Sequence, residues 1–169
     1  MSNSGVSLER SPTSGRSAKY WMGAWLPVVL MVTAIAIEST PWFGSDHTTG
    51  PMRAAWEFLF GRVSDAAWVP IHHMIRKAGH FVGYGLLGLT WLRAWGLTLP
   101  GSNFLRIALL ALAGTALVAS ADEWHQTFLP NRTGRWQDVL LDCCGAVTLL
   151  LAAFAVRSFR ARRRLTRDA

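Results

Sequence analysis

The sequence predicts an all-α membrane protein with four transmembrane helices, short loops and an amphipathic interfacial helix in the first outer loop. Of the 169 residues, 51% are hydrophobic and only 16% are charged, whereas soluble domains carry about 25% charged residues. The apolar residues form four runs that polar segments separate, and most basic residues flank the runs on one side. This blocky apolar composition also excludes a disordered chain.

The four apolar runs between charged residues are 20–37, 81–92, 107–121 and 143–156. All are shorter than the ~20 residues that a bilayer core of ~30 Å requires. We therefore expect each helix to continue past a charged residue into the membrane, or to lie in a thin bilayer. The predicted organisation is a cytoplasmic tail at 1–19, a four-helix transmembrane domain at 20–156 and a basic cytoplasmic tail at 157–169.

The distribution of basic residues predicts the orientation. Eleven of the seventeen Lys and Arg residues lie in the two tails and around the turn between the second and third runs. The positive-inside rule then places both termini in the cytoplasm of a multi-pass protein of the cytoplasmic (inner) membrane. Six basic residues follow the last apolar run directly, which is typical of a juxtamembrane anchor. We therefore expect no nucleic-acid partner.

An amphipathic stretch spans residues 52–67 in the first outer loop. Pro51 and Pro70 bracket it, and its apolar residues recur at helical spacing. This pattern predicts a helix that lies in the outer headgroup layer, or one that packs across the mouth of the bundle. In either position it would cover whatever lies beneath.

The ionisable residues of the last three runs all fall at their outer ends. Counting ~20 residues from each inner end places His80 and Asp142 roughly 8 Å below the outer boundary. An unpaired charge at that depth costs up to ~3 kcal/mol, so we expect a buried ionic network in which Lys77 and Arg132 compensate the acids. The candidate site residues are Lys77, His80, Tyr84, Asp122, Glu123, His125, Gln126, Arg132, Asp138 and Asp142.

Two classes of function fit these residues. In a binding protein, Lys77 and Arg132 would hold a phosphate head group while its tail stays in lipid. In a membrane-embedded hydrolase or transferase, His80 would be the acid or base and Glu123 or Asp122 its orienting or second carboxylate. Lys77 and Arg132 would then hold the anion. The sequence has no G-x-S-x-G motif to supply a nucleophile.

Two further classes are less favoured. The histidines and acids could ligate Zn²⁺, but the sequence has neither an HExxH nor a CxxC motif, so we expect no metal and no other cofactor. A transporter normally shows inverted repeats and broken helices, which four short spans lack.

Two blocks resemble the signatures of the VanZ-like family. Residues 76–87, RKAGHFVGYGLL, carry the first pattern of Lys, His, Phe and Tyr. The second combines DEWHQ at 122–126, Pro130-x-Arg132 and the Asp138, Asp142 and Gly145 spacing, although many relatives have Asn where this chain has Asp142. The resemblance covers about residues 21–154.

The resemblance implies a bacterial envelope protein of about four helices with its signatures at the outer face. The family is named for a protein that lowers susceptibility to teicoplanin, a lipid-tailed glycopeptide. Together with the polar cluster, this makes membrane lipids, a lipid-linked envelope precursor or a teicoplanin-like amphiphile the expected partners, and glycopeptide tolerance a possible outcome.

Overall fold

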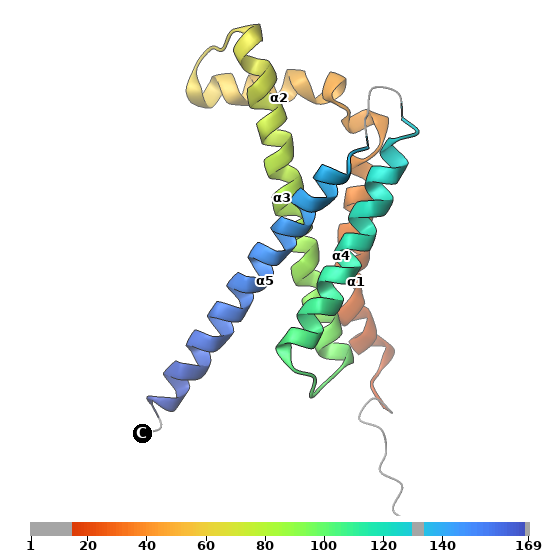
Figure 1. The fold of residues 1–169 in the computed structure, drawn as a ribbon, viewed down its shortest axis with the longest axis vertical. Helices are drawn as coiled ribbons and strands as arrows, with labels where there is room; N and C mark the ends of the chain where they lie inside the picture. The colour runs from red at the N-terminus through yellow and green to blue at the C-terminus, as the bar shows by residue number, and fades with distance from the viewer. Residues whose placement is uncertain (1–14, 130–133, 168–169) are drawn as a thin grey trace, which may run out of the picture.

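The computed structural model describes residues 15–129 and 134–167, and this part of the chain is all-helical, as predicted. The third long helix is central because it contacts each of the other four long helices. The elements are α1 (Ala18–Glu38), η1 (Pro41–Phe43), α2 (Ser45–Phe60), α3 (Asp65–Thr98), α4 (Phe104–Gln126) and α5 (Trp136–Leu165). Figure 1 shows α2 lying across one end of the molecule, while α5 crosses α3 obliquely and leaves the bundle towards its C-terminus.

Within residues 15–129 and 134–167, three helices, α1, α4 and α5, are long and apolar enough to cross a membrane. Large apolar side chains cover their outer surfaces, as Leu30, Leu117 and Leu151 illustrate. Monomeric soluble proteins rarely expose so much contiguous apolar surface, so these faces are suited to lipid. Among the described helices, α3 does not reach the same composition, because histidines and basic residues interrupt its first half.

Polar side chains determine where the helices begin. Ser17, Ser64 and Asn103 are N-caps of α1, α3 and α4, and each side chain accepts a hydrogen bond from a backbone N–H in the first turn. The helices then continue past charged residues, as expected. The basic segment from Arg157 prolongs α5 as far as Leu165.

The prediction of a single amphipathic helix over residues 52–67 is wrong. The chain breaks at Gly61, whose φ of 91° suits glycine, and a new helix begins after Ser64. Pro51 and Pro70 do not bracket an element, because each lies inside a helix. The apolar residues keep their helical spacing across the break by coincidence. A prediction from periodicity alone therefore merged parts of two helices into one.

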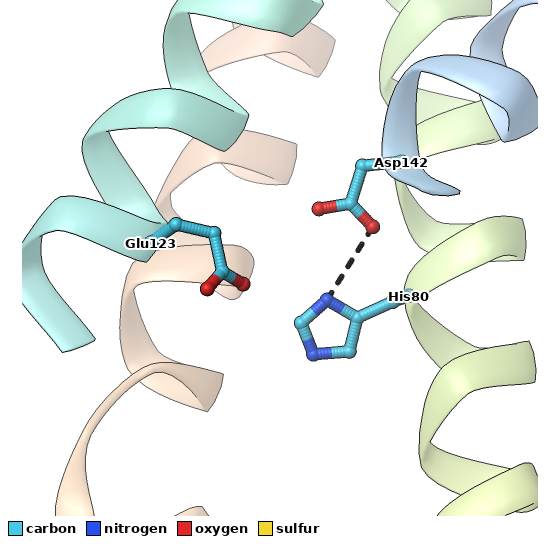
Figure 2. A group of neighbouring side chains, drawn as sticks. All are labelled: His80, Glu123 and Asp142. Carbon is cyan, nitrogen blue, oxygen red and sulfur yellow. Dashed lines mark ion pairs between the residues drawn. The ribbon is translucent and has the colours of Figure 1, made fainter. Parts of the chain in front are cut away.

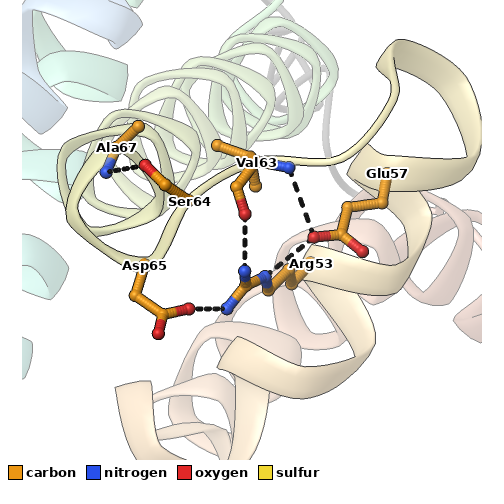
Figure 3. Close-up of polar contacts among 6 residues, drawn as sticks. All are labelled: Arg53, Glu57, Val63, Ser64, Asp65 and Ala67. Atoms are coloured by element: carbon orange, nitrogen blue, oxygen red, sulfur yellow. Dashed lines mark hydrogen bonds and ion pairs between the residues drawn. The ribbon is translucent and has the colours of Figure 1, made fainter.

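One arginine connects the two helices on either side of this break (Figure 3). Arg53 contacts Glu57 Oε1 at 3.0 Å and Asp65 Oδ1 at 2.5 Å, and donates to the carbonyl oxygen of Val63 at 2.6 Å. Hydrogen bonds from Arg53 and from the Val63 N–H lower the pKa of Glu57 from its ordinary value. These contacts join the end of α2 to the start of α3.

Small residues bring α3 and α5 into close contact. A Cβ added to Gly145 would lie 2.0 Å from the backbone oxygen of Phe81, and one added to Gly85 would lie 3.1 Å from the backbone oxygen of Gly145. At Gly88 an added Cβ would lie 3.2 Å from Cβ of Ala146. Such small-residue contacts let helix backbones approach closely in a membrane.

We predict that Gly145→Ala destabilises the protein. The new methyl group would meet a backbone carbonyl, which cannot rotate away, so α3 and α5 must move apart. Overpacking of this kind costs about 1–3 kcal/mol, which corresponds to a fall in Tm of several degrees, measured on purified protein in detergent. Gly96→Ala is the control, because nothing lies within 4 Å of a Cβ at that position. Equal Tm values for the two variants would contradict this packing.

Candidate functional site

The polar residues gather where three helices meet. The first half of α3, the last turns of α4 and the first turns of α5 come together there, since α4 and α5 run in opposite directions. Asp122, Glu123, Gln126 and Asp142 are all buried at this position, and Asp142 is 0% exposed. Buried acids need a partner, so their hydrogen bonds indicate which of them are structural.

Asp122 is satisfied by neutral donors. Its Oδ2 atom accepts hydrogen bonds from the Tyr84 hydroxyl at 3.0 Å and from Gln126 Nε2 at 3.1 Å. Tyr84 also belongs to the apolar core with Leu87 and Ala119, so its ring is fixed. The structure thus joins three of the expected site residues in one buried hydrogen-bonded group.

Lys77 forms an ion pair with Asp138, which confirms the expectation that this lysine meets a carboxylate. Both side chains are partly exposed, and ion pairs at such positions contribute little to stability. Asp138 thus offsets the positive charge of Lys77, which was expected to hold an anion. Arg132, the second expected cation, lies outside the described residues.

His80, Glu123 and Asp142 point toward one another from three different helices (Figure 2). His80 Nδ1 lies 3.5 Å from Asp142 Oδ1, and one ligand atom from each residue lies within 4.8 Å of the other two. Glu123 is held in place because its Oε2 accepts a hydrogen bond from the Arg135 N–H at 2.7 Å. Within residues 15–129 and 134–167, His80 Nδ1 and both Asp142 oxygens have no hydrogen-bond partner.

A cavity of about 180 Å³ opens at the same end of the molecule, between α1, α2, α3 and α4. Its polar lining residues include His80, Tyr84, Asp122 and Gln126. Its apolar lining residues include Ile35, Met52 and Ile75. The lining of the cavity therefore combines hydrogen-bonding groups with hydrocarbon side chains.

Sequence reasoning missed Arg76 as a lining residue. Arg76 Nη1 donates to the carbonyl oxygen of Phe43 at 2.9 Å, which holds the guanidinium beside the cavity. The signal was present, because Arg76, His80 and Gly83 share one helical face at i, i+4 and i+7. The contribution of η1 to the lining had no such signal, whereas Met52 of α2 belongs to the stretch that was expected to cover the site.

Other histidines lie apart from the acids. His125 has an exposed side chain, and its Nδ1 lies 3.3 Å from Ser39 Oγ. His72 is buried between α2 and α3, where its ring nitrogens contact the hydroxyls of Thr48 and Thr49 and its ring stacks on Trp68. The structure thus brings His80 to the acids, whereas His125 is not part of that cluster.

The sequence profile of a family described as VanZ/LLP1 matches residues 22–157. No curated protein and no solved structure matches the chain. The matched segment runs from α1 into α5 and contains His80, Glu123, Asp142 and the residues that line the cavity. Because this match covers most of the chain, the protein belongs to the VanZ-like family.

Proposed function

We propose that this protein binds the head group of a lipid, or of a lipid-tailed amphiphile, at the outer face of the bacterial cytoplasmic membrane. The cavity is the observation that carries the proposal. At about 180 Å³ it is smaller than the roughly 300–1,000 Å³ of pockets that enclose a drug-sized molecule. It has room for a head group, and its apolar lining residues would contact the first part of the attached chains, which would remain in lipid.

In the proposed topology α3 crosses the membrane together with α1, α4 and α5, which makes four spans. Both termini then lie in the cytoplasm. The N-terminus of α1 and the turn between α3 and α4 lie at one end of the molecule, away from the site (Figure 1). Arg93, Arg106 and the basic residues that end α5 belong to that cytoplasmic side. Because α3 contacts every other long helix, its polar residues can face protein instead of lipid.

We propose that α2 and the preceding turn lie in the outer headgroup layer. Trp42 is 77% exposed and Phe58 is 88% exposed, as expected for aromatic side chains at a membrane interface. Arg53 and Glu57 supply a polar counterpart on the same helix. Since α2 contributes Thr48 and Met52 to the cavity wall, its displacement would open the cavity from the side.

The cavity lining suggests the chemistry of the head group. Arg76 has a planar guanidinium that matches phosphate oxygens in addition to its contacts with Phe43 and Thr48, and His80 adds a ring nitrogen. Asp122 and Glu38 are acceptors on the same lining. A phosphate group that also carries hydroxyl or amine donors would contact both kinds of lining residue.

The alternative function is a membrane-embedded hydrolase or transferase acting on a lipid-linked envelope substrate. A specific observation favours it, because His80 lies beside the buried Asp142 and Glu123 while it also lines the cavity. A histidine positioned by carboxylates is a common acid–base arrangement. Both functions use the same cavity, and only turnover of the bound lipid separates them.

We predict that outside and inside labels separate the two ends of the molecule. In a background without Cys143 and Cys144, a membrane-impermeant maleimide added to intact cells should label Gly50→Cys and not Ala161→Cys. Both positions are exposed, so access to the reagent depends on the side of the membrane. The reverse pattern would place the site in the cytoplasm and overturn the proposed topology.

We predict that Arg76→Gln weakens binding of phosphatidylglycerol, measured by native mass spectrometry or in nanodiscs. Hydrogen bonds to charged groups contribute ~1.5–3 kcal/mol, so the dissociation constant should rise roughly tenfold or more. Arg62→Gln makes the same charge change at an exposed position outside the cavity and should bind normally. If both variants lose affinity equally, general surface charge and not the cavity is responsible.

We predict that expression in a susceptible Gram-positive host raises tolerance to teicoplanin more than to vancomycin. The acyl tail of teicoplanin concentrates it in the outer leaflet, where the cavity would lie. Lys77→Ala removes the partner of Asp138, and Glu123→Ala removes a member of the buried cluster. Each should abolish the effect at unchanged membrane abundance. Equal tolerance to both drugs would indicate a general envelope response instead.

A further inference from the structure

His80, Glu123 and Asp142 form a donor set for a metal ion. They supply one imidazole nitrogen and two carboxylate oxygens, which lie within 4.8 Å of one another. Zn²⁺ in catalytic sites takes three protein ligands of these types and keeps a further position open. The HExxH and CxxC motifs, whose absence led us to expect no metal, describe ligands on one helix or loop. These three ligands come from α3, α4 and α5.

The orphaned carboxylate of Asp142 is the second observation. Its side chain is 0% exposed, it points toward His80 and Glu123 (Figure 2), and neither oxygen has a hydrogen-bond partner among the described residues. Burying an ionised carboxylate without compensation is strongly unfavourable. Its ion-pair partner, His80 Nδ1, is 3.5 Å away, which is too long for a good hydrogen bond. A cation between the two groups would satisfy both.

The distances and surroundings suit an ion. Two ligands at ~2.1 Å from a tetrahedral Zn²⁺ are separated by about 3.4 Å, close to the 3.5 Å between His80 Nδ1 and Asp142 Oδ1. The Arg135 N–H occupies one oxygen of Glu123 and leaves the other for the ion. In known metal sites, hydrogen bonds from neighbouring groups to the ligand side chains orient those ligands.

We propose that His80, Glu123 and Asp142 bind a divalent transition-metal ion of the Zn²⁺ class. Mixed imidazole and carboxylate donors favour Zn²⁺, Mn²⁺ or Fe²⁺ over Mg²⁺ and Ca²⁺. The ion would lie next to the cavity, because His80 belongs to both. The site does not depend on the proposed lipid binding, which is tested separately through Arg76.

The test measures metal content and stability of the full-length protein in detergent. After treatment with a chelator, the protein is titrated with ZnCl₂ alone and with CoCl₂, whose visible absorption reports coordination by nitrogen and oxygen. We expect one ion per chain and a rise in Tm of about 5–10 °C at a hundredfold excess over the dissociation constant. His80→Ala, Glu123→Gln and Asp142→Asn should each lose the ion and the rise in Tm.

Two controls separate loss of the ion from loss of the fold. Without metal, Asp142→Asn should be at least as stable as the wild type, because it removes a buried carboxylate whose ion pair with His80 is long at 3.5 Å. Asp122→Asn changes a carboxylate at the same end of the bundle but outside the three ligands, and should retain the ion. A wild type that binds no more Zn²⁺ or Co²⁺ than Asp142→Asn overturns the proposal. Binding that survives all three substitutions and is lost in His73→Ala or His125→Ala, both exposed histidines, also overturns it.

Discussion

The close contact between α3 and α5 at Gly145 is the constraint on which the rest of the structure depends. The Phe81 carbonyl oxygen occupies the place that a side chain at residue 145 would need, so the two backbones approach without one. Asp142 lies one turn before Gly145 on α5, and His80 directly precedes Phe81 on α3. The same approach also brings Lys77 to Asp138, one further turn away on each helix. The geometry of the polar residues is therefore determined by a contact between backbones, which is more rigid than any contact between long side chains.

The acids at this end are compensated very unequally, and the inequality indicates what each does. Asp122 has two neutral donors, which fix its position, and Asp138 has Lys77 at the partly exposed rim. Asp142 has no hydrogen bond among the described residues, although it is the most buried of the acids. Its ion pair with His80 is long at 3.5 Å. A buried carboxylate with so weak a partner has to be offset elsewhere in the fold, and such groups are concentrated at functional sites. The burial of Asp142 thus separates the cluster with His80 and Glu123 from the structural hydrogen bonds around Asp122.

Much of this arrangement could be predicted from the sequence. The helical class and the concentration of polar residues at one end follow from composition and spacing, and the pairing of Lys77 with a carboxylate follows from the cost of burying charge. The break at Gly61 could not be predicted, because the helical period continues across it and only backbone conformation reveals a glycine at positive φ. The grouping of His80, Glu123 and Asp142 without Lys77 or His125 was equally inaccessible. It depends on how three helices rotate about their axes, which one sequence does not determine.

His80 belongs both to the cavity lining and to the cluster with Glu123 and Asp142. Its ring lines the cavity, and its Nδ1 atom faces Asp142. It also stacks on Tyr84, whose hydroxyl donates to Asp122 on the cavity wall. A head group that moves the His80 ring would therefore change the surroundings of Asp142, and a cation held by Asp142 would restrict how the ring meets a head group. The two binding events proposed above, of a head group in the cavity and of a cation in the cluster, would thus be coupled through one side chain. By thermodynamic linkage, each would change the affinity of the other by the same factor.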